Sequence, residues 1–159
     1  MQPKRVKGPD VFLETIGMLR DRFPIHVLLT GPARGYLKDG LGKLGVPFSH
    51  VYLKDFTEIP AYYGALDLYL VTSRDEGGPK GVLESMATGT PLVTTRVGMA
   101  PDIVVSGENG FMTESEDVDF LTERAGQLLE SAGLREQFAS KGLQTSAQYD
   151  WQTIGERYA

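Results

Sequence analysis

The chain has 159 residues, 41% of them hydrophobic, which is enough for a single domain with one full-sized core. Its 16 basic and 21 acidic residues give a net charge of −5, which argues against a broad nucleic-acid-binding surface. The absence of cysteine excludes a disulfide scaffold, a thiolate metal site and a cysteine nucleophile. Because no run approaches the length of a membrane span and no apolar leader opens the chain, we expect no transmembrane segment and a cytoplasmic location.

The first half of the chain alternates between helical and extended patterns. Apolar residues at helical spacing from Val11 onward predict an amphipathic helix to about Arg22, before Pro24. The apolar run IHVLLT at 25–30 ends at a Gly-Pro pair and predicts a central parallel strand. Further elements are expected as a helix at 37–44, a short strand at 51–53 and a short helix at 59–65.

The second half continues this alternation. Strands are expected at 67–72, 91–95 and 110–113, with helices at 79–88 and 100–105. From about residue 116 the pattern is helical, with breaks near Gly133 and Asp150. The sequence therefore predicts one α/β domain over residues 1–159, with a doubly wound parallel sheet covered on both faces and a helical C-terminal tail.

Ligands of such sheets bind beyond the carboxyl ends of the strands, which places EGGPKGVLE at 76–84 beside a candidate site. In this segment Gly77 and Gly78 provide a flexible turn, and Pro79 stands where a helix can begin without needing its N–H group. The N–H groups of a first helical turn hold anions well. An ordinary strand-to-helix turn is the alternative, since tight loops of this kind commonly use glycine.

Glutamates stand at both ends of this segment. Glu84 lies within the predicted helix, and its side chain leans back toward the helix N-terminus. A nucleotide sugar has a diphosphate that suits N–H groups and cations, and hydroxyl-rich rings that suit carboxylate acceptors. We therefore interpret Glu76 and Glu84 as acceptors for sugar hydroxyls; the alternative for Glu84 is a solvated side chain paired with Lys80.

Three other patterns have simpler explanations. GLGKLG at 40–45 matches the dinucleotide-binding glycine pattern but does not open a helix directly after a strand. The acidic pair Asp117 and Asp119 is expected to cap a helix rather than to bind a metal. His26 and His50 lack the spacing of metal ligands, and His26 is expected to be structural.

Several segments together resemble a known family. These are Arg5 with Lys7-Gly8, HVLLTG, VYLKDF, YYGALDLYLVTS, EGGPKGVLESMATGTPLVTT and GENGF. They resemble the C-terminal, donor-binding domain of GT-B retaining glycosyltransferases of the "glycosyl transferases group 1" family. The likeness spans nearly the whole chain, and its most specific part is the pair of glutamates separated by seven residues and followed by Met-Ala, Gly-Thr-Pro and a valine-rich strand.

The resemblance implies roles for individual residues. Glu84 would bind the ribose hydroxyls of the donor, and Glu76 and Lys7 would be the catalytic residues. Glu76 would face the transferred sugar, and Lys7 would neutralise the diphosphate leaving group. The backbone at Gly77, Gly78 and Pro79 would contact the sugar and the distal phosphate.

The resemblance also implies a wider donor site. Its further members would be Arg5, Gly31, Leu53, Lys54 and Lys80. Leu53 and Lys54 would lie beside the base, mainly through the main chain, and Gly31 would line the crevice. Arg5 stands near the place where the family has an arginine, and Lys80 replaces a glycine or small residue, so it either adds a cation to the site or points to water.

Members of the family pair this domain with an N-terminal Rossmann-like domain that binds the acceptor and supplies a catalytic histidine, and no such half is present in this chain. The resemblance therefore implies the donor-binding half of a retaining glycosyltransferase, with a nucleotide-sugar donor, no metal or other cofactor, and no activity in isolation. Peripheral membrane contact of the full protein stays open. Two alternatives are a GT-B-like nucleotide-sugar 2-epimerase domain and a non-catalytic flavodoxin-like binding module.

Overall fold

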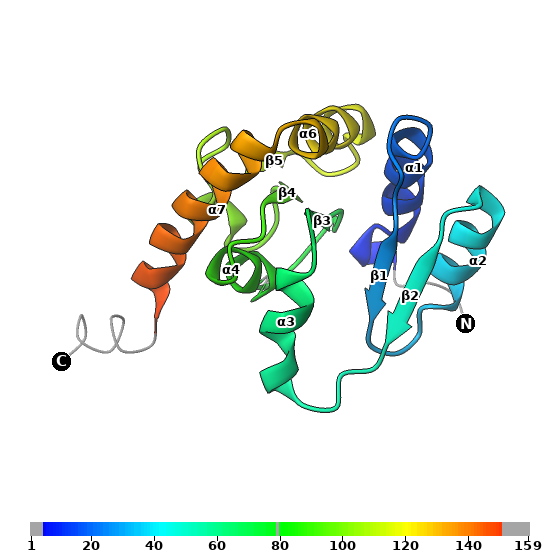
Figure 1. The fold of residues 1–159 in the computed structure, drawn as a ribbon, viewed down its shortest axis with the longest axis horizontal. Coiled ribbons are helices and arrows are strands. Elements are labelled where there is room, and N and C mark those ends of the chain that lie inside the picture. Colours follow the sequence, from blue (N-terminus) through cyan, green and yellow to red (C-terminus); the bar gives the residue numbers. More distant parts are fainter. Residues whose placement is uncertain (1–4, 79, 151–159) are drawn as a thin grey trace.

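The computed structural model describes residues 5–78 and 80–150 (Figure 1). Its strands are β1 (Val27–Thr30), β2 (Phe48–Val51), β3 (Tyr69–Val71), β4 (Leu92–Thr95) and β5 (Phe111–Thr113). Its α-helices are α1 (Pro9–Leu19), α2 (Gly35–Leu44), α3 (Ile59–Gly64), α4 (Lys80–Ala87), α5 (Ala100–Ile103), α6 (Val118–Glu130) and α7 (Ala132–Ser146). Short 3₁₀ turns η1 (Arg5–Lys7), η2 (Phe56–Glu58) and η3 (Ala147–Tyr149) complete the chain order, and the predicted alternation is confirmed.

All the described strand pairs are parallel, as the sequence predicts, but they form two sheets. One sheet pairs β1 with β2, and the other has the order β3-β4-β5. The prediction of a central strand at 25–30 is therefore wrong, because β1 pairs with β2 alone among the described strands and only alternate residues of β1 are fully buried. The predicted strand at 51–53 begins and ends earlier, because β2 pairs residue for residue with β1 from Val27↔Phe48 to Thr30↔Val51. Tyr52 and Leu53 follow the last of these pairs and belong to no strand. The α/β class with helices flanking parallel strands is confirmed.

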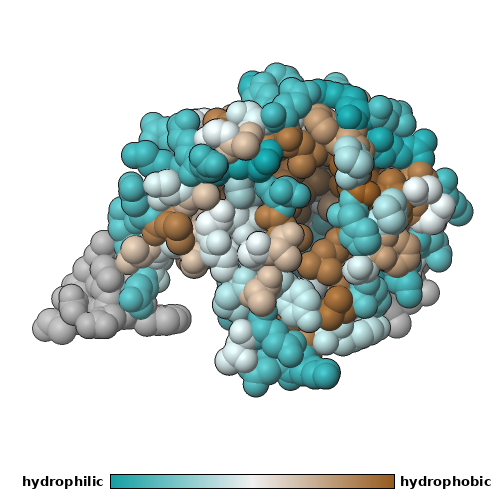
Figure 2. All heavy atoms as spheres, viewed as in Figure 1, coloured by the Kyte–Doolittle hydropathy of each residue, from teal (hydrophilic) through white to brown (hydrophobic). Residues whose placement is uncertain are grey.

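The core lies on both faces of the β3-β4-β5 sheet. Every residue of β4 is buried, and Val93 packs against α1, α6 and α7, whereas Leu92 packs against α4 and α5. A third group of apolar side chains joins β1 to α1 and α2. Figure 2 shows the consequence at the surface, where hydrophilic side chains cover most of the outer rim and apolar ones gather toward the middle of this face.

Local capping explains the boundaries of the tail. Asp117 accepts a hydrogen bond from the Phe120 backbone N–H at 3.1 Å, so the prediction that it caps a helix is confirmed. Ser131 ends α6 and caps α7 by accepting from the Leu134 N–H at 3.2 Å, so the break comes two residues before Gly133. Among the helices described, none is long and apolar enough to cross a bilayer.

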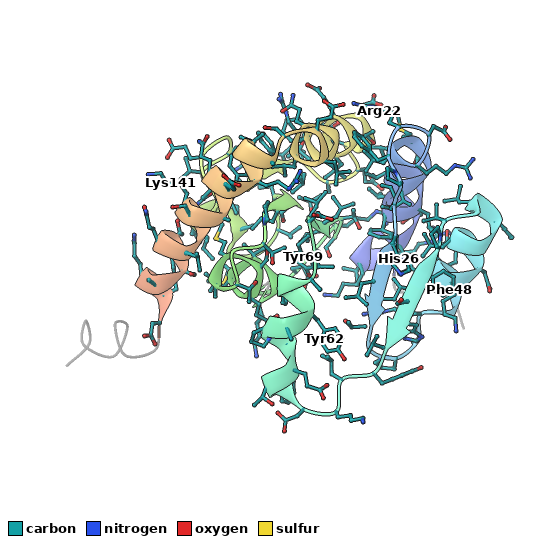
Figure 3. All side chains as sticks on the ribbon, viewed as in Figure 1. Arg22, His26, Phe48, Tyr62, Tyr69 and Lys141 are labelled. Carbon is teal, nitrogen blue, oxygen red and sulfur yellow. The ribbon has the colours of Figure 1, made fainter. Side chains whose placement is uncertain are left out.

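The glycine pattern at 40–45 lies inside α2 and at its C-terminal cap, away from any strand-to-helix junction, as predicted. His26, immediately before β1 (Figure 3), has its Nε2 2.9 Å from the Ser49 hydroxyl, which agrees with a structural role.

Candidate functional site

The N-terminal segment around Gly8 packs against the carboxyl end of β3. The Thr72 hydroxyl donates to the Gly8 carbonyl at 2.9 Å, and the Arg74 N–H donates to the Val6 carbonyl at 2.8 Å. Gly8 has a φ of 57°, and any side chain there would overlap the Thr72 carbonyl oxygen. Only glycine therefore allows this close approach, which brings the start of α1 beside the loop that leads to α4.

Lys7 and Glu76, predicted as the catalytic residues, are brought together by this packing. Lys7 Nζ lies 2.5 Å from Glu76 Oε1, and the same oxygen accepts a hydrogen bond from the Ser73 hydroxyl at 2.8 Å. The Glu76 side chain is 17% exposed, whereas that of Lys7 is 52% exposed. The glutamate is thus held in place by two donors, and the lysine presents its remaining N–H groups to solvent.

Arg74 organises the same loop, although no motif in the sequence marks it. Its guanidinium contacts both carboxylate oxygens of Asp10 at 2.8 Å, Glu116 at 2.7 Å and the Arg5 carbonyl at 2.7 Å. The hydrogen bond from Arg74 holds the pKa of Asp10 at about 2, below its usual 3.8, and the hydrogen bond to Asp10 raises the pKa of Arg74 in turn. The position of Arg74 directly after a strand was visible in the sequence, but its partners, 64 and 42 residues away, were not.

Arg5, predicted as a donor-binding residue, contributes its carbonyl to this network, while its side chain is exposed. Within residues 5–78 and 80–150, that side chain makes no hydrogen bond or ion pair.

The start of α4 is open to solvent. Gly77 and Gly78 are exposed, and a Cβ added to either would meet no atom within 4 Å. Pro79 lies outside the described residues. Lys80 opens the helix, and its exposed side chain has no ion-pair partner in the part of the chain that the structure describes. A ligand can therefore reach the backbone of Gly77 and Gly78 without meeting a described side chain close to either residue.

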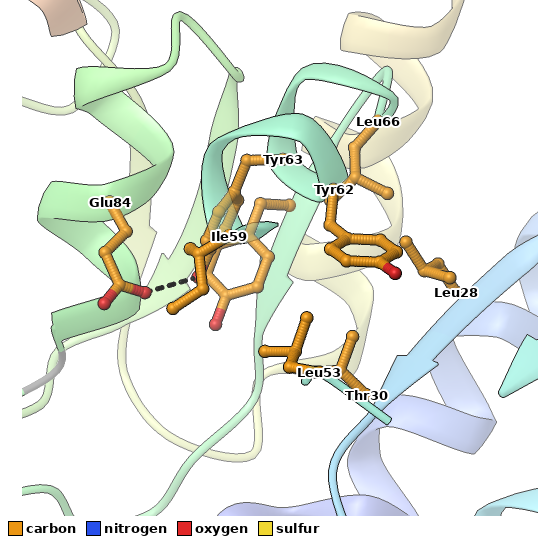
Figure 4. A pocket seen from close by; sticks show the side chains of 9 residues that line it. Leu28, Thr30, Leu53, Ile59, Tyr62, Tyr63, Leu66 and Glu84 are labelled. Atoms are coloured by element: carbon orange, nitrogen blue, oxygen red, sulfur yellow. Dashed lines mark hydrogen bonds between the residues drawn. The ribbon is translucent and has the colours of Figure 1, made fainter. Parts of the chain in front are cut away.

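Glu84 is partly buried one turn further along α4, and it pairs with Tyr63 rather than with Lys80. The Tyr63 hydroxyl donates to Glu84 Oε2 at 3.1 Å (Figure 4). Both residues line a cavity of about 170 Å³ between the two sheets. Its lining residues are Leu28, Thr30, Leu53, Ile59, Tyr62, Tyr63, Leu66, Tyr69 and Glu84. The structure thus places Glu84 and Leu53, the residues predicted for ribose and base, in one largely apolar cavity.

The other predicted residues lie near the carboxyl ends of β1 and β2. Gly31 has a φ of 77°, and its carbonyl accepts from His50 Nε2 at 2.8 Å. The Lys54 side chain is exposed, and its backbone N–H already donates to Glu58 Oε2 at 3.2 Å. A main-chain contact from Lys54 to a base would therefore use its carbonyl oxygen.

Two tyrosines beneath α4 were also missed by sequence reasoning. The rings of Tyr63 and Tyr69 meet edge to face with centroids 5.1 Å apart. Burial is the main cause that raises the pKa of each phenol above its usual value of 10. Gly81 lies directly against the two hydroxyls, so a side chain at this position would collide with that of Tyr69. Their spacing in the sequence does not distinguish them from ordinary core tyrosines.

The site therefore combines an exposed Gly77-Gly78 turn before a helix, a lysine, two carboxylates and an apolar cavity; the Lys80 N–H of that helix already donates to the Gly78 carbonyl at 2.8 Å. Phosphate groups suit the first two, hydroxyl groups suit the carboxylates, and a flat ring suits the cavity. Over the described residues there is no group of three or more histidine, cysteine, aspartate or glutamate side chains arranged to hold a metal ion.

The family model described as "Glycosyl transferases group 1" matches residues 1–131. The chain belongs to this family. A D-inositol 3-phosphate glycosyltransferase from Corynebacterium urealyticum is 30% identical over 97% of this chain and 39% of its own length. The lipopolysaccharide core biosynthesis mannosyltransferase LpsB from Rhizobium meliloti is 31% identical over 78% of this chain and 38% of its own. The chain thus spans about two fifths of the length of these curated relatives.

Solved structures share the same fold. Anabaena Alr3699/HepE in complex with UDP and glucose aligns over 99% of this chain and 45% of its own with a TM-score of 0.86 and 22% identity. The C-terminal domain of the glycosyl transferase group 1 family protein LpcC from Francisella tularensis aligns over 94% of this chain and 83% of its own with a TM-score of 0.81 and 24% identity. The group 1 family and a Rossmann-like GT-B fold are therefore established for this chain.

Proposed function

We propose that this chain is the nucleotide-sugar-binding half of a retaining glycosyltransferase. The observation that carries the proposal is that Glu84 reaches the same cavity as Leu53, while the helix that holds Glu84 begins at Lys80, shortly after the exposed Gly77-Gly78 turn. A nucleoside diphosphate sugar has its base, ribose, diphosphate and sugar in that linear order. The apolar cavity, the carboxylate and the helix start offer groups that suit the first three of these in turn.

In this proposal the ribose hydroxyls donate to Glu84, and the diphosphate accepts from the backbone of the α4 turn. Lys7 adds a cation beside that turn, held there by Glu76. When the bond between the sugar and the diphosphate breaks, negative charge grows on the leaving nucleoside diphosphate. Lysine and helix N–H groups stabilise that charge electrostatically, and Glu76 faces the transferred sugar. This chemistry requires no metal ion from the chain's own residues.

The complete enzyme needs more than this chain. Because the curated relatives are more than twice as long, we propose that a second domain binds the acceptor and that the isolated chain transfers no sugar. The donor class is supported by structural neighbours whose complexes contain UDP, from Anabaena and from Staphylococcus aureus TarM. A cytoplasmic location stays a prediction.

Titration calorimetry of the chain with UDP, GDP and ADP tests the donor proposal. We expect one nucleotide to bind clearly and Glu84→Gln to weaken its binding about tenfold or more, since hydrogen bonds to a charged group contribute about 1.5 to 3 kcal/mol. Glu136→Gln, which removes an exposed carboxylate from α7, is the matched control and should bind like the wild type. Absence of binding by all three nucleotides would overturn the proposal.

Retention is tested separately with the full-length protein. NMR of the first product formed from a donor of known anomeric configuration should show that configuration preserved. An inverted product would contradict the retaining mechanism and leave donor binding intact.

A further inference from the structure

Glu84 has one oxygen engaged and one available. Tyr63 donates to Oε2, whereas Oε1 makes no hydrogen bond with any residue of 5–78 or 80–150. A carboxylate on a helix can rotate about its terminal bond, so its two oxygens are interchangeable unless a fixed donor distinguishes them. Tyr63 is such a donor.

The structure holds Tyr63 more firmly than a surface tyrosine. Its carbonyl accepts a hydrogen bond from the Thr90 hydroxyl at 2.8 Å, which ties the end of α3 to the segment before β4. Its ring packs edge to face on Tyr69, and its hydroxyl lies against the backbone of α4 at Gly81. The donor and the helix that carries the acceptor are therefore fixed relative to each other.

We propose that Tyr63 is a positioning residue for nucleotide recognition, which orients the Glu84 carboxylate so that Oε1 alone is presented to the ribose hydroxyls. This inference rests on the proposed donor site and adds a residue to it. The phenol suits the task, because a tyrosine hydroxyl is protonated at neutral pH and burial raises its pKa further, so it stays the donor and the carboxylate the acceptor.

The consequence is a specific effect on ribose recognition. Without the Tyr63 hydroxyl, the carboxylate loses a partner and gains rotational freedom, so the hydrogen bonds to ribose become weaker. Tyr63→Phe keeps the aromatic ring that lines the cavity, and the hydroxyl is not among the groups proposed for the diphosphate, so contacts to base and diphosphate should keep their strength. Loss of the hydroxyl should therefore reduce the preference for ribose over deoxyribose, whereas a merely structural defect would weaken all nucleotides equally.

The test compares dissociation constants for three ligands built on whichever base among UDP, GDP and ADP binds best: the nucleoside diphosphate and its 2′-deoxy and 3′-deoxy analogues. For Tyr63→Phe, the ratio of deoxy to ribo dissociation constants should fall about threefold to tenfold, the range of one hydrogen bond. Tyr36→Phe removes an exposed phenol from α2 and should keep the wild-type ratio. In a Glu84→Ala background, Tyr63→Phe should change the ratio no further, because the tyrosine acts through the carboxylate.

The outcomes separate this inference from the proposed function. No nucleotide binding by the wild type removes the donor site itself. Normal binding with a ratio that Glu84→Ala lowers and Tyr63→Phe leaves unchanged removes only the role of Tyr63. Should Tyr63→Phe fail to fold, a crystal structure of the wild-type complex decides: ribose at Oε1 with the Tyr63 hydroxyl still donating to Oε2 supports the inference, and ribose bridging both oxygens with the Tyr63 hydroxyl turned away from the carboxylate overturns it.

Discussion

Replacing Gly8 with alanine should destabilise the protein strongly, although the change adds a single methyl group. Gly8 is buried, has a φ of 57°, and lies so close to β3 that a methyl group would overlap the Thr72 carbonyl oxygen. The left-handed backbone costs a non-glycine residue about 1 to 2 kcal/mol. Relief of the overlap must move one backbone away from the other, and this weakens the hydrogen bond from the Thr72 hydroxyl to the Gly8 carbonyl, for about 1 kcal/mol more.

We therefore expect Gly8→Ala to lower the free energy of unfolding by about 2 to 4 kcal/mol, a large part of the stability of an ordinary domain. Urea denaturation followed by circular dichroism at neutral pH measures this difference. Because the shift also moves Lys7 away from the α4 turn, nucleoside diphosphate affinity should fall in parallel.

Gly133→Ala is the matched control. Gly133 lies exposed in the first turn of α7, its φ is not positive, and a Cβ there would meet no atom within 4 Å. Alanine should leave stability unchanged or raise it by up to about 1 kcal/mol. If the free energy of unfolding of Gly8→Ala lies within about 0.5 kcal/mol of the wild-type value, the close packing of the N-terminal segment on β3 is wrong.

Three further predictions follow from the same contacts. The folded-state pKa of Asp10 is about 2 against a usual 3.8, so its ion pair with Arg74 stabilises the fold above about pH 4, and this contribution is lost as the pH falls toward 2. Because 48% of the Asp10 side chain is exposed, we expect the pair to contribute about 1 kcal/mol to the free energy of unfolding. Asp10→Asn should remove this contribution, which acid denaturation of both proteins measures. Gly81→Ala should lower the free energy of unfolding by about 1 to 3 kcal/mol by pushing against the Tyr69 hydroxyl, and an unchanged thermal melt would contradict that packing. Lys7→Met should weaken nucleoside diphosphate binding about threefold to tenfold in calorimetry and leave binding of the bare nucleoside unchanged, while an equal loss for both ligands would place Lys7 away from the phosphates.

Elements whose pattern is local were predictable from the sequence. The PLVTT run predicts a strand, and β4 forms there with every residue buried between two helical layers. The cap at Asp117 was predictable for the same reason, since its partner lies three residues away. Boundaries that depend on a distant partner were not: the end of β2 is set by the length of β1, and the division of the strands into two sheets has no local signal.

In the candidate site, too, the features that depend on one short segment were predictable and those that depend on distant residues were not. The flexible turn at Gly77 and the inward-leaning Glu84 are features of one short segment and were predicted from it. The pairs that orient the carboxylates are tertiary, with Tyr63 21 residues from Glu84 and Lys7 far from Glu76 in the sequence. No spacing rule connects such residues, because only the folded chain brings the ends of α3 and η1 to α4.

The central claim is that one helix start and its two glutamates bind a nucleoside diphosphate sugar. A crystal structure of the chain with the best-binding nucleoside diphosphate tests it most directly. We predict phosphate oxygens within hydrogen-bonding distance of the Gly77-Gly78 turn, ribose hydroxyls at Glu84 and the base beside Leu53. A nucleotide bound elsewhere on the surface, with the cavity beside Glu84 empty, would contradict the account.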